Sequence, residues 1–162
     1  MKKILVILAA CVLTSISVSA QNWAIGARVG ATIEFDAQYD FGNTYLEGRF
    51  GAGFCSHANI AADFSLLYNW KALEWGNWTP SAGNWFLDAG VGINVGGREH
   101  YAYVGPAGLV RFGIHFTNAP VSLSLDWNPA FGVGIAYWNN GSVADFNGLG
   151  LANIGITCVF HL

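Results

Sequence analysis

The feature that most constrains this chain is the alternation of apolar residues with small or polar ones along nearly all of it after residue 22. A period of two is the pattern of a β-strand whose two faces meet different surroundings. Short turn-forming segments such as 40–43 and 96–99 separate the alternating stretches. The pattern predicts an all-β chain of eight antiparallel strands, over 23–35, 46–54, 60–70, 85–93, 101–116, 121–127, 131–137 and 152–162.

The sixth and seventh of these segments are separated only by Asn128 and Pro129 and the residues beside them. Asn128 and Pro129 either end a strand or form a bulge within one long strand over 121–138, which would reduce the count to seven. Bacterial single-chain membrane barrels have even strand numbers. We therefore expect eight strands, in an up-and-down barrel.

Composition narrows the environment of this barrel. Hydrophobic residues make up 53% of the chain and charged residues only 10%, a balance that excludes intrinsic disorder and coiled coils. No stretch after the first twenty residues has the roughly 18 uninterrupted apolar residues of a transmembrane helix. The chain is therefore apolar on alternate residues rather than continuously.

The two faces of the predicted strands differ sharply in charge. The faces that we interpret as apolar carry no Asp, Glu, Lys or Arg. A bore of eight strands has room only for ordinary filling side chains, so the aromatic-rich face is too bulky to point inward. We expect it to face lipid, and the charged face to fill the interior with ion pairs, because an unpaired buried charge is prohibitive. This predicted interior network comprises Arg28, Glu34, Glu47, Arg49, Asp63, Asp88, Arg111, His115 and Asp126.

Aromatic residues gather near the predicted strand ends. Outer-membrane barrels carry aromatic girdles at both membrane interfaces, and this placement favours a girdle over the general preference of aromatic residues for strands. The predicted girdle comprises Trp23, Trp70, Trp85, Trp127, Tyr137 and Phe160.

The first twenty residues have the pattern of a secretory signal peptide. Lys2 and Lys3 precede an apolar stretch that ends at the small residues 18–20, which predicts cleavage after Ala20 and a barrel domain over 21–162. Residues 8–11 offer an alternative, a lipobox that would place a lipid on Cys11. Removing the two lysines leaves five basic and ten acidic residues, so nucleic acid is not an expected partner.

Two stretches, 105–114 and 119–129, resemble those of small outer-membrane β-barrel proteins of Bacteroidetes-type bacteria, which are porin-like or OmpX/OmpA-like barrels. The end of the chain resembles the C-terminal signal that the barrel assembly machinery reads, on Asn153, Gly155, Cys158 and Phe160, although it closes on Leu162 rather than on an aromatic residue. The resemblance implies an integral outer-membrane protein in contact with lipid and lipopolysaccharide. It implies architecture and no chemistry.

Candidate catalytic and metal-binding residues are few. Of the four histidines, only His115 has a carboxylate and serines nearby in the predicted hairpin, namely Asp126 with Ser122 or Ser124, which is the one arrangement suited to a lipid-modifying hydrolase. Histidine spacing predicts no metal site, and no cofactor is expected. Cys55 and Cys158 are predicted on opposite faces, which argues against a disulfide.

The connection over 71–83 contains Trp75 and Trp78 and is the most distinctive loop. If the N-terminus is periplasmic, the predicted strand count places this loop and the 139–148 loop outside the cell. An extracellular ligand would then meet loops 72–83 and 139–148. The two tryptophans either stack on a sugar or host protein or fold back onto the barrel rim.

The sequence as a whole predicts a non-enzymatic outer-membrane barrel with a structural or surface-interaction role and a plugged polar interior. A narrow channel for ions or small solutes is the main alternative. A lipid-modifying hydrolase and a soluble ligand-binding barrel are further alternatives.

Overall fold

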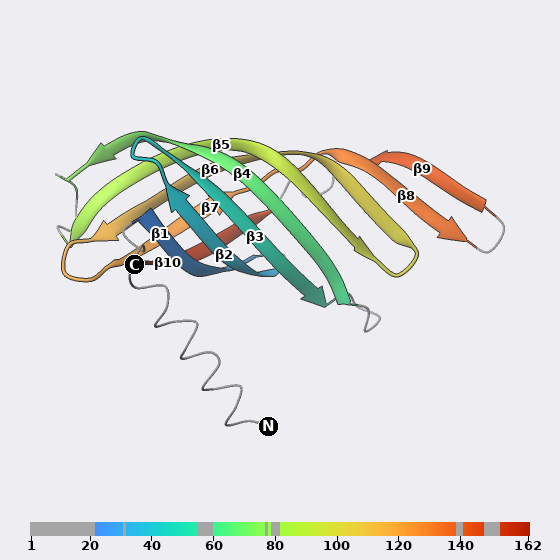
Figure 1. The fold of residues 1–162 in the computed structure, drawn as a ribbon, viewed down its shortest axis with the longest axis horizontal. Helices are drawn as coiled ribbons and strands as arrows, with labels where there is room; N and C mark the ends of the chain where they lie inside the picture. Colours follow the sequence, from blue (N-terminus) through green and yellow to red (C-terminus); the bar gives the residue numbers. More distant parts are fainter. Residues whose placement is uncertain are drawn as a thin grey trace, which may run out of the picture.

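The computed structural model describes residues 22–30, 32–54, 60–76, 78, 82–138, 141–147 and 153–162. Every named element is a strand (Figure 1). Among these residues no helix is long and apolar enough to cross a membrane. The strands are β1 (Trp23–Val29), β2 (Ile33–Asp40), β3 (Thr44–Phe54), β4 (Ile60–Trp75), β5 (Gly83–Arg98), β6 (Tyr101–Phe116), β7 (Val121–Trp127), β8 (Gly132–Trp138), β9 (Gly141–Asn147) and β10 (Ile154–His161).

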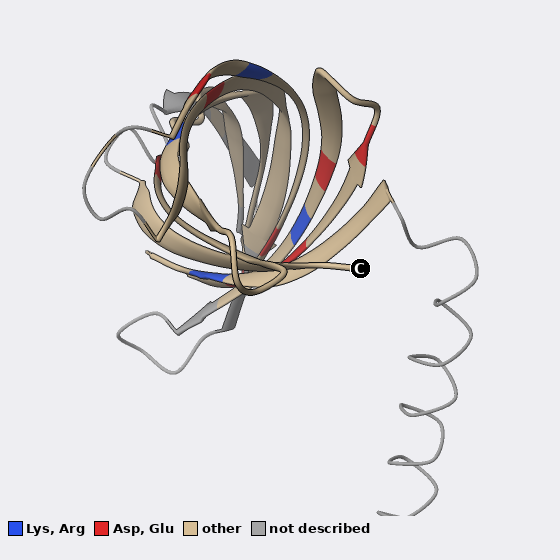
Figure 2. Ribbon diagram, turned by 90° about the vertical axis from the view of Figure 1, so that its left-hand side faces the viewer, with Lys and Arg blue, Asp and Glu red and all other residues tan. Residues whose placement is uncertain are grey.

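The strands close into a ring. Neighbours in sequence pair antiparallel from β1 to β7, and β10 pairs with both β7 and β1. Strands β7 and β8 lie end to end along β6, so together they count as one of the strands around the barrel wall. Strand β9 pairs with β8 and β10 pairs with β7, so β9 and β10 likewise count as one. We call each such place in the ring a wall position. In Figure 2 the strands form a closed ring. The prediction of an eight-stranded antiparallel up-and-down barrel is confirmed.

Segments 121–127 and 131–137 correspond to separate strands, β7 and β8, but the expectation that they lie side by side in the wall is wrong. They lie end to end in the place of one long strand, as in the alternative. Trp127 pairs with Val110 and Val133 pairs with Val104, so β7 and β8 keep a single register along β6. The break between them is local. Pro129 has no N–H to donate to β6, and the side-chain amide of Asn128 donates to the Gly108 carbonyl there, while the Gly108 N–H still donates to the Pro129 carbonyl at 2.8 Å.

The predicted single strand over 23–35 is also wrong, because it is the β1–β2 hairpin. The backbone N–H of Gly30 donates to the Thr32 carbonyl at 3.0 Å in a tight turn. Val29 pairs with Ile33 across it, and both side chains point outward. The two residues are four positions apart, which is an even step, so the alternation passes through the turn without a break. One predicted strand is therefore two strands. This gain offsets the loss from β7 and β8, which share one wall position, and the barrel has eight wall positions.

The additional hairpin decides which connections share an end of the barrel. The terminal end, as we name it, holds the start of β1, the C-terminus and the β2–β3, β4–β5 and β6–β7 connections. Backbone hydrogen bonds join its parts, for example Leu162 N–H to the Trp23 carbonyl and Thr117 N–H to the Ala82 carbonyl. The distal end holds the β1–β2, β3–β4, β5–β6 and β8–β9 connections, of which the β8–β9 hairpin extends furthest (Figure 1).

Segments 72–83 and 139–148, predicted as loops, are partly strand, because 72–75 belong to β4 and 141–147 form β9. The connections that they contain follow β4 and β8, which end at opposite ends of the barrel. The expectation that one side of a membrane presents both loops is wrong for two reasons. The missed turn at residues 30–32 reverses the direction of the strands from β2 to β7. Because the chain does not turn back between β7 and β8, the later strands have the expected direction again.

The two faces of the wall have the polarity expected from the alternation. Val29, Ile33 and Phe50 are each about 60% exposed on the outside, whereas Arg28 and Arg49 are fully buried inside. Large hydrophobic side chains are exposed on all sides of the ring, from β1 to β10. The protein is thus apolar outside and charged inside, the reverse of a water-soluble protein.

Candidate functional site in the barrel interior

Arg28 on β1 anchors one side of the central network. Its Nη1 donates to Glu34 Oε1 at 2.8 Å, and its Nε donates to Asp126 Oδ1 at 2.6 Å. Arg28 and Glu34 are direct cross-strand partners, so the hairpin register itself brings them together. Asp126 also accepts a short hydrogen bond from the Thr157 hydroxyl, which links β7 to β10.

Two further arginines complete the network. Arg49 Nε donates to Glu47 Oε1 at 2.6 Å, and Arg111 Nη2 donates to the same oxygen at 2.6 Å. Asp36 lies 3.8 Å from Arg49 and 3.5 Å from Arg111. The guanidinium groups come from β1, β3 and β6, and their carboxylates come from β2, β3 and β7. All are buried, so the ion pairs tie together strands from around the ring (Figure 2).

The structure places most of the predicted interior residues together, with three differences in detail. Asp88 joins the network through Tyr45, whose hydroxyl donates to Asp88 Oδ2 at 2.9 Å and accepts from Arg111 Nη1 at 3.1 Å. Asp63 is half-buried against Gly51, outside the ion pairs of the described residues. His115 is also outside them, and its ring stacks on Phe86 with centroids 4.1 Å apart.

The sequence prediction missed Asp36, Tyr45 and Thr157. Asp36 lay just past the predicted end of the first strand, and Tyr45 lay just before the second. The alternation of polar residues through 34, 36, 38 and 40 would have revealed Asp36, because it continues to the true end of β2. Thr157 carries no charge and gave no signal of its own.

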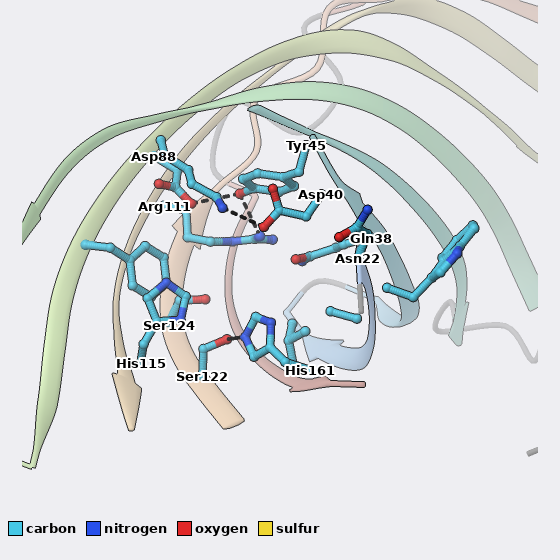
Figure 3. Close-up of a pocket in the computed structure, with 15 residues that line it drawn as sticks. Asn22, Gln38, Asp40, Tyr45, Asp88, Arg111, His115, Ser122, Ser124 and His161 are labelled. Carbon is cyan, nitrogen blue, oxygen red and sulfur yellow. Dashed lines mark hydrogen bonds and ion pairs between the residues drawn. The ribbon is translucent and has the colours of Figure 1, made fainter. Parts of the chain in front are cut away.

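A pocket of about 80 Å³ lies between this network and the terminal end (Figure 3). Arg111, Tyr45 and Asp88 form part of its lining, joined by the hydrogen bonds given above. His161 Nε2 lies 3.1 Å from Ser122 Oγ on another part of the lining. Lys71, which also lines the pocket, pairs with Asp40 at 2.6 Å, and both side chains are partly exposed.

The residues of the candidate hydrolase site do not assemble. Asp126 is bound to Arg28 and Thr157 rather than to His115. Ser122 contacts His161, and the Ser124 hydroxyl donates to the Thr157 carbonyl at 3.4 Å. Within the described part of the chain, no group of three or more His, Cys, Asp or Glu side chains is placed to hold a metal ion.

The predicted girdle residues have differing positions. Trp23, Trp70 and Phe160 are exposed near the terminal end, and Trp85 lies half-buried there. Trp127 is exposed, but it lies partway along the wall rather than at one of its ends, because β8 follows β7 along β6. Tyr137 lies in β8, and its side chain is outside the described residues.

Trp75 and Trp78 fold back onto the outer wall at the terminal end. The Trp78 ring is 5.3 Å from Trp85, and the Trp75 ring is 6.1 Å from Phe112. Trp85 and Phe112 themselves stack at 5.2 Å. Of the two interpretations of these tryptophans, the structure has the one in which they pack on the barrel rim.

The residues of the predicted assembly signal lie on or beside β10, which pairs with β1 and so closes the barrel. Gly155 faces inward, and a Cβ there would lie 2.6 Å from Arg28 Cζ, so the glycine leaves room for the guanidinium group. Cys158 is exposed with a free thiol. Cys55 lies outside the described residues.

Fold and site together define a closed eight-stranded β-barrel with an apolar outer surface and an interior filled by ion pairs. No protein-family model matches the chain, and neither the curated proteins nor the solved structures compared with it give a match.

Proposed function

We propose that this protein is an integral outer-membrane barrel with a structural or surface-interaction role and a plugged polar interior. The inverted polarity of the wall is the observation that carries the proposal. Outward side chains such as Val91, Leu125 and Ile156 are each more than half exposed. A continuous apolar exterior of this extent suits lipid, whereas a soluble monomer exposes only limited apolar patches.

The closed wall supports the same location. In hydrocarbon every backbone polar group needs a partner within the protein, and a closed barrel provides one. Pairing of β10 with β1 leaves no open edge between the first and the last strand. A C-terminal strand in this position also fits recognition by the barrel assembly machinery, through Asn153, Gly155, Cys158 and Phe160.

We place the termini on the periplasmic side, which puts the distal end outside the cell. The 139–148 loop, rather than loop 72–83, then remains the candidate for contact with an extracellular ligand. Lipopolysaccharide and lipid would contact the outer wall between the two ends. The finer resemblance to porin-like or OmpX/OmpA-like barrels of Bacteroidetes-type bacteria belongs to this same proposal.

Cysteine labelling tests both the location and the orientation. His100→Cys lies in the exposed β5–β6 turn at the distal end, and Asn118→Cys lies in the β6–β7 turn at the terminal end. Both variants are made with Cys55 and Cys158 replaced by serine. With a membrane-impermeant maleimide on intact cells, we expect labelling at position 100 and labelling at 118 only after the outer membrane is opened. Equal labelling of both positions in intact cells would contradict the proposed orientation.

The plugged interior has its own test, which separates this role from a narrow channel. Arg28, Arg49 and Arg111 with their carboxylates fill the centre of the barrel. In planar lipid bilayers we expect no steady single-channel conductance from the wild-type protein. A stable conductance step would contradict the plug and favour a channel for ions or small solutes.

A further inference from the structure

The buried charges of the barrel interior do not balance. Among the residues whose side chains the structure describes, three arginines, Arg28, Arg49 and Arg111, are buried with five carboxyl groups. Those carboxyl groups belong to Glu34, Asp36, Glu47, Asp88 and Asp126. Burial of an uncompensated charge costs several kcal/mol, so an interior with this excess favours additional positive charge, as cations or as protons.

Asp88 is the buried carboxyl group whose surroundings best suit a bound cation. It is 5% exposed and lines the pocket at the terminal end (Figure 3). Its Oδ2 accepts from Tyr45, whereas its Oδ1 is buried and has no hydrogen-bond partner among the described residues. A carboxylate oxygen in this situation attracts a positively charged group that enters the pocket.

The other lining groups narrow the kind of cation. Gln38 and Ser122 add neutral oxygen atoms to the lining, which suit a hard cation or an ammonium group. The second carboxylate of the lining, Asp40, is already paired with Lys71 at 2.6 Å. One free carboxylate oxygen matches a single positive charge, and the volume of about 80 Å³ has room for a small ion together with several water molecules.

We propose that this pocket binds a small monovalent cation, either an alkali metal ion or a primary ammonium group, with Asp88 as its charged ligand. The site is a blind pocket rather than a path, because the ion pairs of Arg111 and Glu47 lie behind it. The proposal rests on the closed barrel and its interior, and does not depend on the location of the protein in a membrane.

Direct binding can be measured on the mature protein folded in detergent at pH 8. We would titrate NaCl, KCl and methylammonium chloride separately and follow the thermal unfolding midpoint. Choline chloride, whose quaternary ammonium group has no N–H to donate to a carboxylate, would keep the ionic strength constant. Sodium NMR line broadening provides a second, direct readout. We expect a saturable rise in the midpoint with at least one of the small cations, because a ligand of the folded state stabilises it by mass action.

Two variants locate the effect. Asp88→Asn keeps an acceptor for Tyr45 and removes the charge, and should weaken the apparent affinity roughly tenfold or more. Glu99→Gln, at the exposed distal turn, is the matched control and should bind like the wild type. Tighter binding of Na⁺ or K⁺ would identify the ligand as an alkali metal ion, and tighter binding of methylammonium would identify it as a primary ammonium group. Either result supports the site.

The same titrations can overturn the proposal. Without a saturable effect of any small cation on the wild type, Asp88 is neutralised by a proton and the site does not exist. The wild-type titration gives this answer even if Asp88→Asn fails to fold. Binding that is retained in Asp88→Asn places the cation elsewhere. Binding that appears only in Lys71→Met shows that Lys71 itself neutralises Asp88.

Discussion

The inner and outer faces of the same strands follow opposite rules. Arg28 and Val29 are neighbours in β1, yet the first is fully buried among ion pairs and the second is 60% exposed. Inside, the three arginines have specific carboxylate partners, and the loss of one arginine leaves those carboxylates unsatisfied. Outside, most apolar side chains only cover the wall, and one apolar residue can replace another. In this fold, therefore, the interactions that require a particular partner are the polar ones inside, whereas the apolar outer surface requires no particular partner.

The largest expected effect is the loss of an interior arginine. Arg28→Ala leaves Glu34 and Asp126 buried without their main partner. We expect the free energy of unfolding to fall by about 3–5 kcal/mol, as for other broken buried ion pairs. Urea unfolding in lipid vesicles, followed by tryptophan fluorescence, measures this loss. A fall below about 1 kcal/mol would match a solvent-exposed ion pair instead, and would contradict the burial of this network.

A charge on the outer face should have the next largest effect. Val91 is 57% exposed on the outside of β5. Val91→Arg should destabilise the protein in vesicles by about 2–4 kcal/mol if that position lies near the bilayer midplane. Val91→Leu is the matched control and should change little. Equal stability of the arginine and leucine variants in lipid would mean that this face does not meet hydrocarbon.

Glycine positions allow the two faces to be compared with one substitution. A Cβ at inward Gly155 would lie 2.6 Å from Arg28 Cζ, whereas a Cβ at outward Gly48 would have no atom within 4 Å. Gly155→Ala should cost about 1–3 kcal/mol through crowding. Gly48→Ala should be nearly neutral. The same unfolding measurement on both variants checks this, and similar losses at both positions would remove the contrast between the faces.

The smallest expected effect concerns the exception on the outer face, the packed tryptophans. Trp78 contacts Trp85 at a ring distance of 5.3 Å. Trp78 is 53% exposed and also lies 5.9 Å from Trp75 and 6.0 Å from Phe112, so Trp78→Ala should lower the free energy of unfolding by only about 0.5–1.5 kcal/mol in total. Leu73→Ala, at a 59% exposed position on β4, is the control. If the two variants lose the same amount, the contacts of Trp78 are no more specific than the rest of the outer surface.

Much of this architecture was predictable from the alternation, because a period of two fixes which side chains share a face. Arg28, Glu47 and Arg111 were therefore placed correctly in the interior. The strand bounds were not predictable in the same way. The turn after Val29 preserves the alternation, and the break at Asn128 interrupts it although the strand continues.

The partners within the interior could not be predicted from the face alone, because they depend on the register between strands. Asp36 meets Arg49 directly across β2 and β3, and Asp88 reaches Arg111 through Tyr45. Neither contact has a signal in the spacing along the chain. The end of the barrel at which each loop lies also depended on the missed turn after Val29 and on the absence of a turn between β7 and β8.

The central claim is that the chain forms a closed barrel with its apolar face outward. A heat-modifiability gel on the mature protein, folded in detergent and loaded with or without boiling, tests it most directly. We predict a clear difference in mobility between the two lanes, and a requirement for detergent to keep the protein in solution. Equal mobility in both lanes, from a protein that stays dissolved in plain buffer, would contradict the claim.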